Sequence, residues 1–233
     1  MQLQLEELNN EFDKLHTIHG ESDYMPIYGA GCTDNPEICL IFMNPTARNI
    51  SADPKRSWLR APRLGLKQTR KMLYDLGFIS REIASKTQAD TSSRTPEFAQ
   101  ELYEHIASRK IFITNLAKCT QSDAKHLSDK VFKEYLPTLF QEINLLQPQK
   151  VVIFGNQVNS IILERPITVS SYEGDTFEIK MIHNQIYQIY PCRYPVGMGF
   201  RNMAKAKERV KNIIGKTNPL DQNSFMESQR DHE

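Results

Sequence analysis

Four short apolar runs of the sequence are each followed by polar residues that could do chemistry: Met43-Asn44-Pro45, Thr114-Asn115, Gly155-Asn156 and Arg193-Tyr194-Pro195. A carboxamide both donates and accepts hydrogen bonds, so an asparagine at such a position can hold a polar ligand in one orientation. The usual phosphate-cradling motifs, GxGxxG and GxxxxGK[ST], are absent from the sequence, as is the G-x-S-x-G elbow of hydrolases. The three histidines considered, His16, His19 and His183, are too scattered to predict a metal site or a catalytic triad.

The apolar runs predict the strands of a sheet. Ile38–Phe42, 111–113, 151–154 and 186–190 are short and bounded by turn residues, as is typical of buried parallel strands. Residues with helical spacing alternate with them and predict helices over 2–16, 66–76, 96–106, 129–145, 156–163 and 200–214. The sequence therefore predicts an α/β fold, a three-layer α/β/α sandwich around a central four-stranded parallel sheet. In such sheets ligands bind beyond the carboxyl ends of the strands, which is where the polar residues stand.

The remaining segments complete the expected organisation of the chain. We expect one domain over residues 1–215, with an N-terminal helix within 1–20 and a disordered tail over 216–233. A polar stretch at 84–95 predicts a loop, and residues 167–180 predict a peripheral hairpin.

Composition narrows the class of protein. Of 233 residues, 39% are hydrophobic and 24% charged, which is ordinary for a globular protein, and no apolar run reaches the roughly 20 residues that span a membrane. The acidic, amphipathic start of the chain is unlike a secretory signal, and the four cysteines form no CxxC pair. We therefore expect a cytoplasmic protein that is not bound to a membrane.

The net charge of +1 conceals an uneven distribution. Eight basic residues lie between Arg48 and Lys71 against Asp53 alone, and a second group occupies the last predicted helix: Arg201, Lys205, Lys207, Arg209 and Lys211. Such patches let a protein of neutral total charge hold a phosphate backbone, although each could equally be a solvated helix face. Arg56, Arg60, Arg63 and Arg201 are the candidate DNA contacts.

Four segments at these strand ends and core strands resemble the uracil-DNA glycosylase superfamily. Phe42-Met43-Asn44-Pro45 is similar to its first motif, written GMNPG or GINPG, and Tyr194-Pro195-Val196-Gly197-Met198 to its second, HPSPL or NPSGL. Ile111–Cys119 resembles the YITNVVKC segment of the iron–sulfur branch, and residues 136–156 resemble a further stretch of that branch. The four segments follow the order of the family over about residues 27–214.

The resemblance implies a role for each site residue. Asn44 would position the water that attacks the sugar, while Met43 and Asn115 would bind the base, the Asn115 carboxamide reading the edge of uracil. Trp58 would form the aromatic floor of the pocket, with Phe42 and Tyr28 as weaker candidates. Met198 would be the apolar wedge that fills the gap left by a flipped-out base.

Several departures from the family pattern bear on activity. Tyr194 stands where the second motif usually has a histidine that stabilises the departing base. Phe42 and Thr46 replace glycines, and Val196 replaces a serine. Cys119 matches one ligand of the iron–sulfur branch, but Tyr135 occupies the next ligand position, so we expect ordinary buried cysteines and neither a cofactor nor a metal.

These observations predict a glycosylase that removes uracil from DNA, acting as a monomer. Three alternatives remain open. The first is a glycosylase for another damaged base. The second is a catalytically weak or inactive member of the superfamily that binds nucleic acid or nucleotides. The third is an unrelated α/β protein whose Asn-Pro motif is accidental.

Overall fold

The structure is a computed structural model that describes residues 2–56, 66–86, 95–123 and 127–215. Within them, six strands form one sheet in the order β1-β3-β2-β4-β6-β5. The strands are β1 (Ala30–Gly31), β2 (Ile38–Phe42), β3 (Ile111–Asn115), β4 (Lys150–Phe154), β5 (Glu178–Ile182) and β6 (Gln185–Cys192). The four central strands β3, β2, β4 and β6 are parallel, whereas β1 and β5 pair antiparallel at the two edges. The predicted four-stranded parallel centre is therefore confirmed, with two edge strands added.

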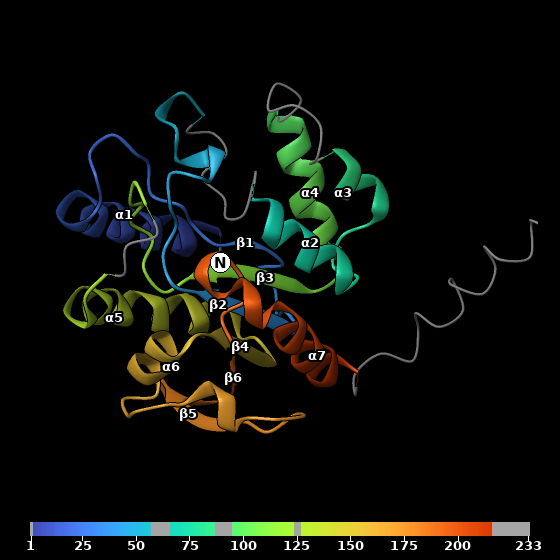
Figure 1. Ribbon diagram of the computed structural model, residues 1–233. Coiled ribbons are helices and arrows are strands. Elements are labelled where there is room, and N and C mark those ends of the chain that lie inside the picture. Colours follow the sequence, from blue (N-terminus) through green and yellow to red (C-terminus); the bar gives the residue numbers. More distant parts are fainter. Residues whose placement is uncertain (1, 57–65, 87–94, 124–126, 216–233) are drawn as a thin grey trace, which may run out of the picture.

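Helices cover both faces of the sheet (Figure 1). One layer consists of α2 (Lys67–Asp75), α3 (Arg81–Lys86), α4 (Pro96–Ser108) and α7 (Met203–Ile214). The other consists of α1 (Gln2–His19), α5 (Asp129–Leu146) and α6 (Asn156–Ile162). Every residue of β2 and β3 is buried, as expected for strands with helices on both sides. This confirms the three-layer α/β/α prediction.

Side chains of β2 alternate between the two layers. Ile38, Leu40 and Phe42 pack in the core beneath α2, α4 and α7, while Cys39 and Ile41 pack beneath α1 and α5. A strand with this alternation and no exposed face must lie in the middle of a sandwich. The same alternation places Phe42 and Met43, neighbours in the first motif, on opposite faces of the sheet.

Local signals in the sequence set the ends of several helices. Thr95 caps α4 by accepting a hydrogen bond from the Phe98 N–H, and Pro96 follows at the first helical position. Ser128 caps α5 in the same way, through the Val131 N–H. Between them, these caps fix the start of one helix in each layer.

Two predictions of local structure were wrong. The hairpin expected over 167–180 is instead formed by β5 and β6, which are joined at His183 and Asn184. Both residues have positive φ, 46° and 66°, the geometry that a two-residue turn between right-twisted strands requires. The loop expected from residue 84 begins later, because α3 runs to Lys86; residues 87–94 and the tail 216–233 lie outside the described residues.

The N-terminal helix packs on α5. The ring of Phe12 stacks on that of Tyr135 with centroids 6.3 Å apart, and His19 Nε2 lies 2.6 Å from a Glu134 carboxylate oxygen. None of the helices in the described part of the chain has the length and apolar character needed to cross a membrane.

Candidate active site

A cleft of about 840 Å³ opens at the carboxyl ends of the parallel strands. Its walls come from the segments that follow β2, β4 and β6, from the start of α2 and from two 3-10 helices, η4 (Val169–Ser171) and η5 (Gly197–Asn202). The position agrees with the rule that ligands of open α/β sheets bind beyond the strand ends. Three of the predicted site residues line the cleft: Met43, Asn44 and Tyr194.

The segment after β2 is held by the segment after β3. Beyond the paired strands, the N–H groups of Leu116 and Ala117 donate to the carbonyl oxygens of Phe42 and Met43, at 2.8 and 3.0 Å. The strand pairing thus continues past the end of β2 as far as the first motif. Asn44 is therefore attached to a rigid support rather than to a free loop.

Asn44 is buried apart from 8% of its surface. Its side-chain Nδ2 donates to the carbonyl oxygen of Pro45 at 3.2 Å, which fixes the orientation of the amide. The described part of the chain supplies no hydrogen bond to its Oδ1. That oxygen, in a residue that lines the cleft, can accept a hydrogen bond from a water or a ligand.

Tyr194 is half-buried and lies between two glycines. A Cβ added at Gly155 would come within 3.5 Å of the Tyr194 ring, and one at Gly199 would lie 2.2 Å from the Tyr194 carbonyl oxygen. A side chain at Gly199 is therefore sterically excluded while Tyr194 keeps this position. Phe42 meets the Tyr194 ring edge-on, with centroids 6.2 Å apart. Gly155, Gly199 and Phe42 thus leave a space at the cleft that fits Tyr194, the residue that replaces the usual histidine.

The second motif is tied to α2. The N–H of Gly197, a residue with φ of 59°, donates to the side-chain Oε1 of Gln68 at 2.7 Å. Gln68 lies in the first turn of α2 and lines the cleft with its neighbours Lys67 and Thr69. The backbone of Met198 follows in η5, but its side chain is outside what the structure describes, so its predicted role as a wedge stays a prediction.

Phe42 and Asn115 do not line the cleft. The two residues are register partners on β2 and β3. Phe42 is fully buried against Phe154, with ring centroids 4.5 Å apart, and Asn115 is 1% exposed. The strand alternation explains the position of Phe42: because Met43 lines the cleft above one layer, its neighbour enters the core of the other. Phe42 therefore contacts the Tyr194 ring from the core side and is not placed to stack on a bound base.

A buried ion pair contacts the backbone of Asn115. Lys118 Nζ lies 2.8 Å from Glu142 Oε2, and it donates to Thr114 Oγ1 at 2.6 Å and to the Asn115 carbonyl oxygen at 2.7 Å. The Lys118 side chain is 0% exposed and that of Glu142 is 4% exposed. Burial lowers the pKa of Lys118, and the charge of Glu142 opposes this shift. Sequence reasoning noted Lys118 only as part of a motif and missed this network.

Among the described residues, three cations line the cleft: Arg48, Lys67 and Arg193. Sequence reasoning placed the first two in a basic segment but singled out neither, and the third is adjacent to Tyr194. Of the predicted DNA contacts, Arg201 is exposed on η5 and Arg56 is half-buried at the end of the 3-10 helix η2 (Pro54–Arg56). Arg60, Arg63 and Trp58 lie outside the described residues.

Arg209 corrects the predicted basic face of α7. It is 6% exposed, and its guanidinium donates to the carbonyl oxygens of Pro191, Gly174 and Thr176 at 2.7, 3.0 and 2.7 Å. It joins α7 to the end of β6 and to the loop before β5. Burial lowers its pKa from the usual arginine value. Arg209 is therefore a structural residue and not part of a DNA-binding surface.

The four cysteines are buried, and none is in a disulfide. Burial raises the pKa of Cys39, Cys119 and Cys192, the last to about 12, which leaves their thiols protonated at neutral pH. Among the described residues, no group of three His, Cys, Asp or Glu side chains is close enough to hold a metal ion.

The fold and the site define an α/β protein with a polar, cation-lined cleft at its strand ends. Residues 34–215 match the model of the uracil DNA glycosylase superfamily. The chain therefore belongs to this superfamily, whose members are hydrolases of the glycosylase type that act on damaged DNA. The match excludes the alternative of an unrelated α/β protein. A search of curated proteins gave no match.

Proposed function

We propose that the protein is a DNA glycosylase that hydrolyses the N-glycosidic bond of uracil, or of a related damaged base, in base-excision repair. The observation that carries the proposal is that Asn44 and Tyr194, one from each family motif, line one cleft whose walls also carry Arg48, Lys67 and Arg193. A damaged nucleotide brings a polar base and a phosphate backbone into such a site. The cations suit the backbone, and the polar strand-end residues suit the base and the attacking water.

The reaction sets tasks that these residues can perform. The base–sugar bond breaks through an oxocarbenium-like transition state, with positive charge on the sugar and negative charge on the departing base. The Asn44 Oδ1 can hold a water by accepting its hydrogen bond, and it stabilises positive charge on the sugar through its dipole. A carboxamide is a poor base, so its contribution is to position the water rather than to remove a proton from it.

The departing base needs a hydrogen-bond donor or a positive charge. Tyr194 provides a phenolic O–H at the cleft, and the guanidinium of Arg193 lines the same wall. Such donors act best in a site that is partly closed to water, because electrostatic interactions are stronger there. We therefore assign leaving-group stabilisation to Tyr194 with Arg193 beside it. The assignment of Asn115 as the reader of the base rests on the resemblance alone.

The test is a base-release assay. Labelled single- and double-stranded oligonucleotides that carry uracil, hypoxanthine or xanthine are incubated with the protein, and abasic sites are then cleaved with alkali. We expect strand cleavage for at least one base, and its loss in Asn44→Ala. The matched control is Asn144→Ala, because Asn144 lies on α5 beside α1, away from the strand-end cleft.

The absence of abasic product from every substrate would overturn the proposal. Binding of these oligonucleotides without base release would then support the alternative of an inactive member that binds nucleic acid.

A further inference from the structure

A second groove, of about 440 Å³, runs beside the cleft between α2 and α3. Its α2 wall consists of Lys67, Arg70, Lys71, Tyr74 and Asp75, which recur at helical spacing and so lie on one face of the helix. The opposite face of α2 carries Thr69, Met72 and Leu73, all buried. Lys67 lines both the cleft and the groove, so the two sites are adjacent.

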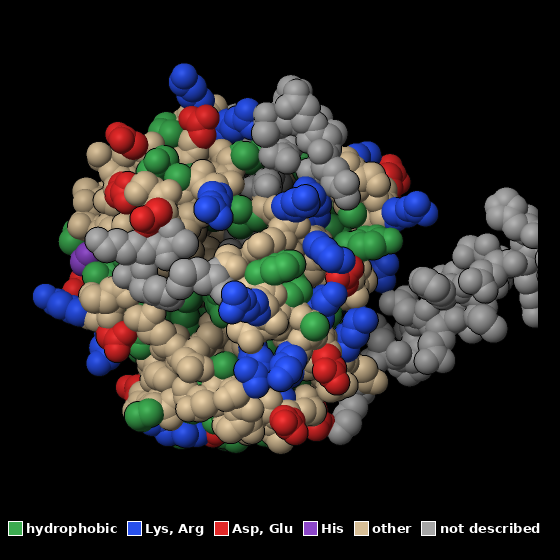
Figure 2. Space-filling view, in the orientation of Figure 1, with side chains coloured by type: hydrophobic (Ala, Val, Ile, Leu, Met, Phe, Trp, Pro, Cys, Tyr) green, Lys and Arg blue, Asp and Glu red, His purple; other side chains and the backbone are tan. Residues whose placement is uncertain are grey.

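The groove is positively charged. Its only acidic lining residue among those described, Asp75, is already paired with Lys207 of α7 and lies 3.1 Å from Lys71. Arg81 of α3 lines the other wall, and neither it nor Lys67 forms an ion pair within the described part of the chain. Figure 2 shows Lys and Arg side chains gathered over α2 and α7. An anionic polymer would therefore be attracted along this face.

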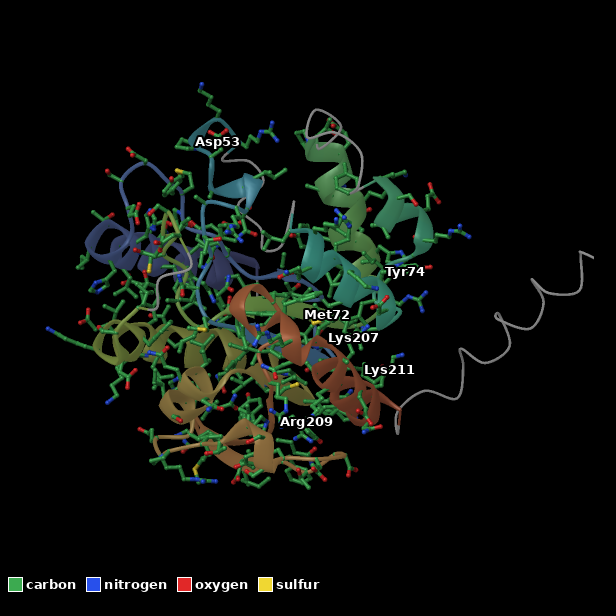
Figure 3. All side chains as sticks on the ribbon, viewed as in Figure 1. Asp53, Met72, Tyr74, Lys207, Arg209 and Lys211 are labelled. Carbon is green, nitrogen blue, oxygen red and sulfur yellow. The ribbon has the colours of Figure 1, made fainter. Side chains whose placement is uncertain are left out.

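Tyr74 makes the groove more than a basic patch. Tyr74 is 44% exposed, whereas a large aromatic residue is normally packed more deeply in a folded protein. It lies on the outer side of α2 (Figure 3) and lines the groove together with Arg70, Lys71 and Arg81. An exposed aromatic ring among cations is the arrangement with which proteins hold single-stranded nucleic acid, since bases stack on the ring while cations hold the phosphates.

We propose that this groove binds the single-stranded DNA segment that flanks the target nucleotide. One base of the flank stacks on Tyr74, and the phosphates on either side contact Lys67 and Arg81. Duplex DNA fits the arrangement less well, because its bases are stacked on one another and offer no free face to Tyr74. The link to a target nucleotide rests on the proposed function, whereas binding of a single strand in the groove does not.

The test uses undamaged DNA, so that it does not depend on catalysis. Binding of a fluorescent oligothymidylate is measured by anisotropy, alongside a duplex of the same length. Tyr74→Ala should weaken single-strand binding at least about fivefold and leave duplex binding within about twofold. Tyr74→Trp, which keeps a stacking surface, should bind the single strand as well as the parent does. Phe177→Ala is the control, because Phe177 is equally exposed, at 44%, but lies next to β5 at the far edge of the sheet.

Salt dependence tests the phosphate contacts separately. Arg81→Ala should reduce the slope of log affinity against log salt by about 0.7 for the single strand, the value for one phosphate contact. An equal loss for single strand and duplex in Tyr74→Ala, or no loss for either, would overturn the proposal. So would a Phe177→Ala variant that weakens single-strand binding as much as Tyr74→Ala does.

The two proposals can fail independently. If the parent releases no base but Tyr74→Ala still loses single-strand affinity, the groove stands and the proposed catalytic function falls. If the parent releases base and Tyr74→Ala binds oligothymidylate like the parent, the groove falls alone. Where both hold, Tyr74→Ala should raise the concentration of single-stranded DNA that is needed for half-maximal base release.

Discussion

The ammonium group of Lys118 lies 2.8 Å from the carboxylate of Glu142, in the core between β3 and α5. Lys118 follows β3 by three residues, and it also holds the Thr114 hydroxyl and the Asn115 carbonyl oxygen at the end of that strand. A buried pair of this kind rarely adds net stability over apolar residues of similar size. Its effect here is to fix the backbone where β3 ends, beside the first motif.

Replacing one member of this ion pair should lower the free energy of unfolding far more than replacing both members together. Glu142→Leu leaves a buried ammonium without its counter-charge and should lower the free energy of unfolding by about 3–5 kcal/mol. The double variant with Lys118→Met should regain most of that loss. Urea unfolding of the two single variants and the double variant measures this. A double variant as unstable as the sum of the singles would contradict the assignment of the pair as a coupled unit.

Asn44→Ala should lower the rate of base release in a single turnover by at least about tenfold while binding of the damaged DNA stays within about twofold. The reason is that the Asn44 Oδ1 acts on the water in the transition state and not on the DNA backbone. Rapid-quench kinetics and anisotropy on the same oligonucleotide separate the two effects. A parallel loss of affinity and rate would move Asn44 from the reaction to binding.

Tyr194→His should raise the rate of uracil release, because it exchanges the phenolic O–H for the histidine donor that most branches of the superfamily use. An oxyanion-type donor is worth up to about 3 kcal/mol in total, and Tyr194 already supplies one in the parent, so the gain should be about a fewfold. Tyr194→Phe, which keeps the ring but removes the O–H, should slow the reaction. If neither change alters the rate, Tyr194 plays no part in stabilising the departing base.

Asp75 makes a pH-dependent tie between α2 and α7. Burial alone would raise the pKa of this carboxyl, but hydrogen bonds from Lys207 and Lys71 outweigh it and hold the pKa below its ordinary value of 3.8. The folded state therefore binds fewer protons than the unfolded state, so this contribution to stability is full above about pH 4 and is lost as the pH falls through the lower folded pKa. The stability difference between the parent and Asp75→Asn should shrink over that range. Chemical unfolding at a series of acidic pH values measures it, and a constant difference would contradict the shift.

The cleft cations should make DNA binding depend on salt. Arg193→Ala should weaken binding to all sequences about equally and lower the salt slope by about one for duplex DNA, because one phosphate contact is lost. Lys110→Gln is the control, because Lys110 is exposed and directly precedes β3, at the opposite ends of the strands from the cleft, and it should leave the slope unchanged. An unchanged slope in Arg193→Ala would remove this residue from contact with the backbone.

The sequence predicted the centre of the fold better than its edges. The four parallel strands are short apolar runs, and burial on both faces is what makes such runs visible. β1 has only two residues, and β5 alternates exposed Ile179 and Met181 with less exposed Glu178 and Lys180, so neither stands out as an apolar run. β1 pairs with β3, which lies far along the chain, and local patterns do not reveal such a partner.

For the site, sequence motifs located Met43, Asn44 and Tyr194 but not their surroundings. Phe42 was placed with the base because it belongs to the same motif, whereas the alternation of a buried strand sends it into the core. Arg209 was counted among surface cations because nothing in the sequence shows the three carbonyl groups that surround it. Lys67 and Arg193 are far apart in the sequence, and they meet at the cleft because of the order of the strands in the sheet. The sequence alone does not reveal that order.

The buried cysteines give the molecule its own reporters of local motion. Thiolates react with alkylating reagents and thiols do not, so Cys39, Cys119 and Cys192 are protected while the helices that cover them stay in place. Cys192 lies under the layer of α2 and α7, and Cys39 and Cys119 lie under that of α1 and α5. The rate at which each one is alkylated therefore measures how often its own layer opens, without any label being introduced. A ligand that settles in the cleft should slow labelling of Cys192, because the cleft is walled by α2, and leave the other two thiols as they were.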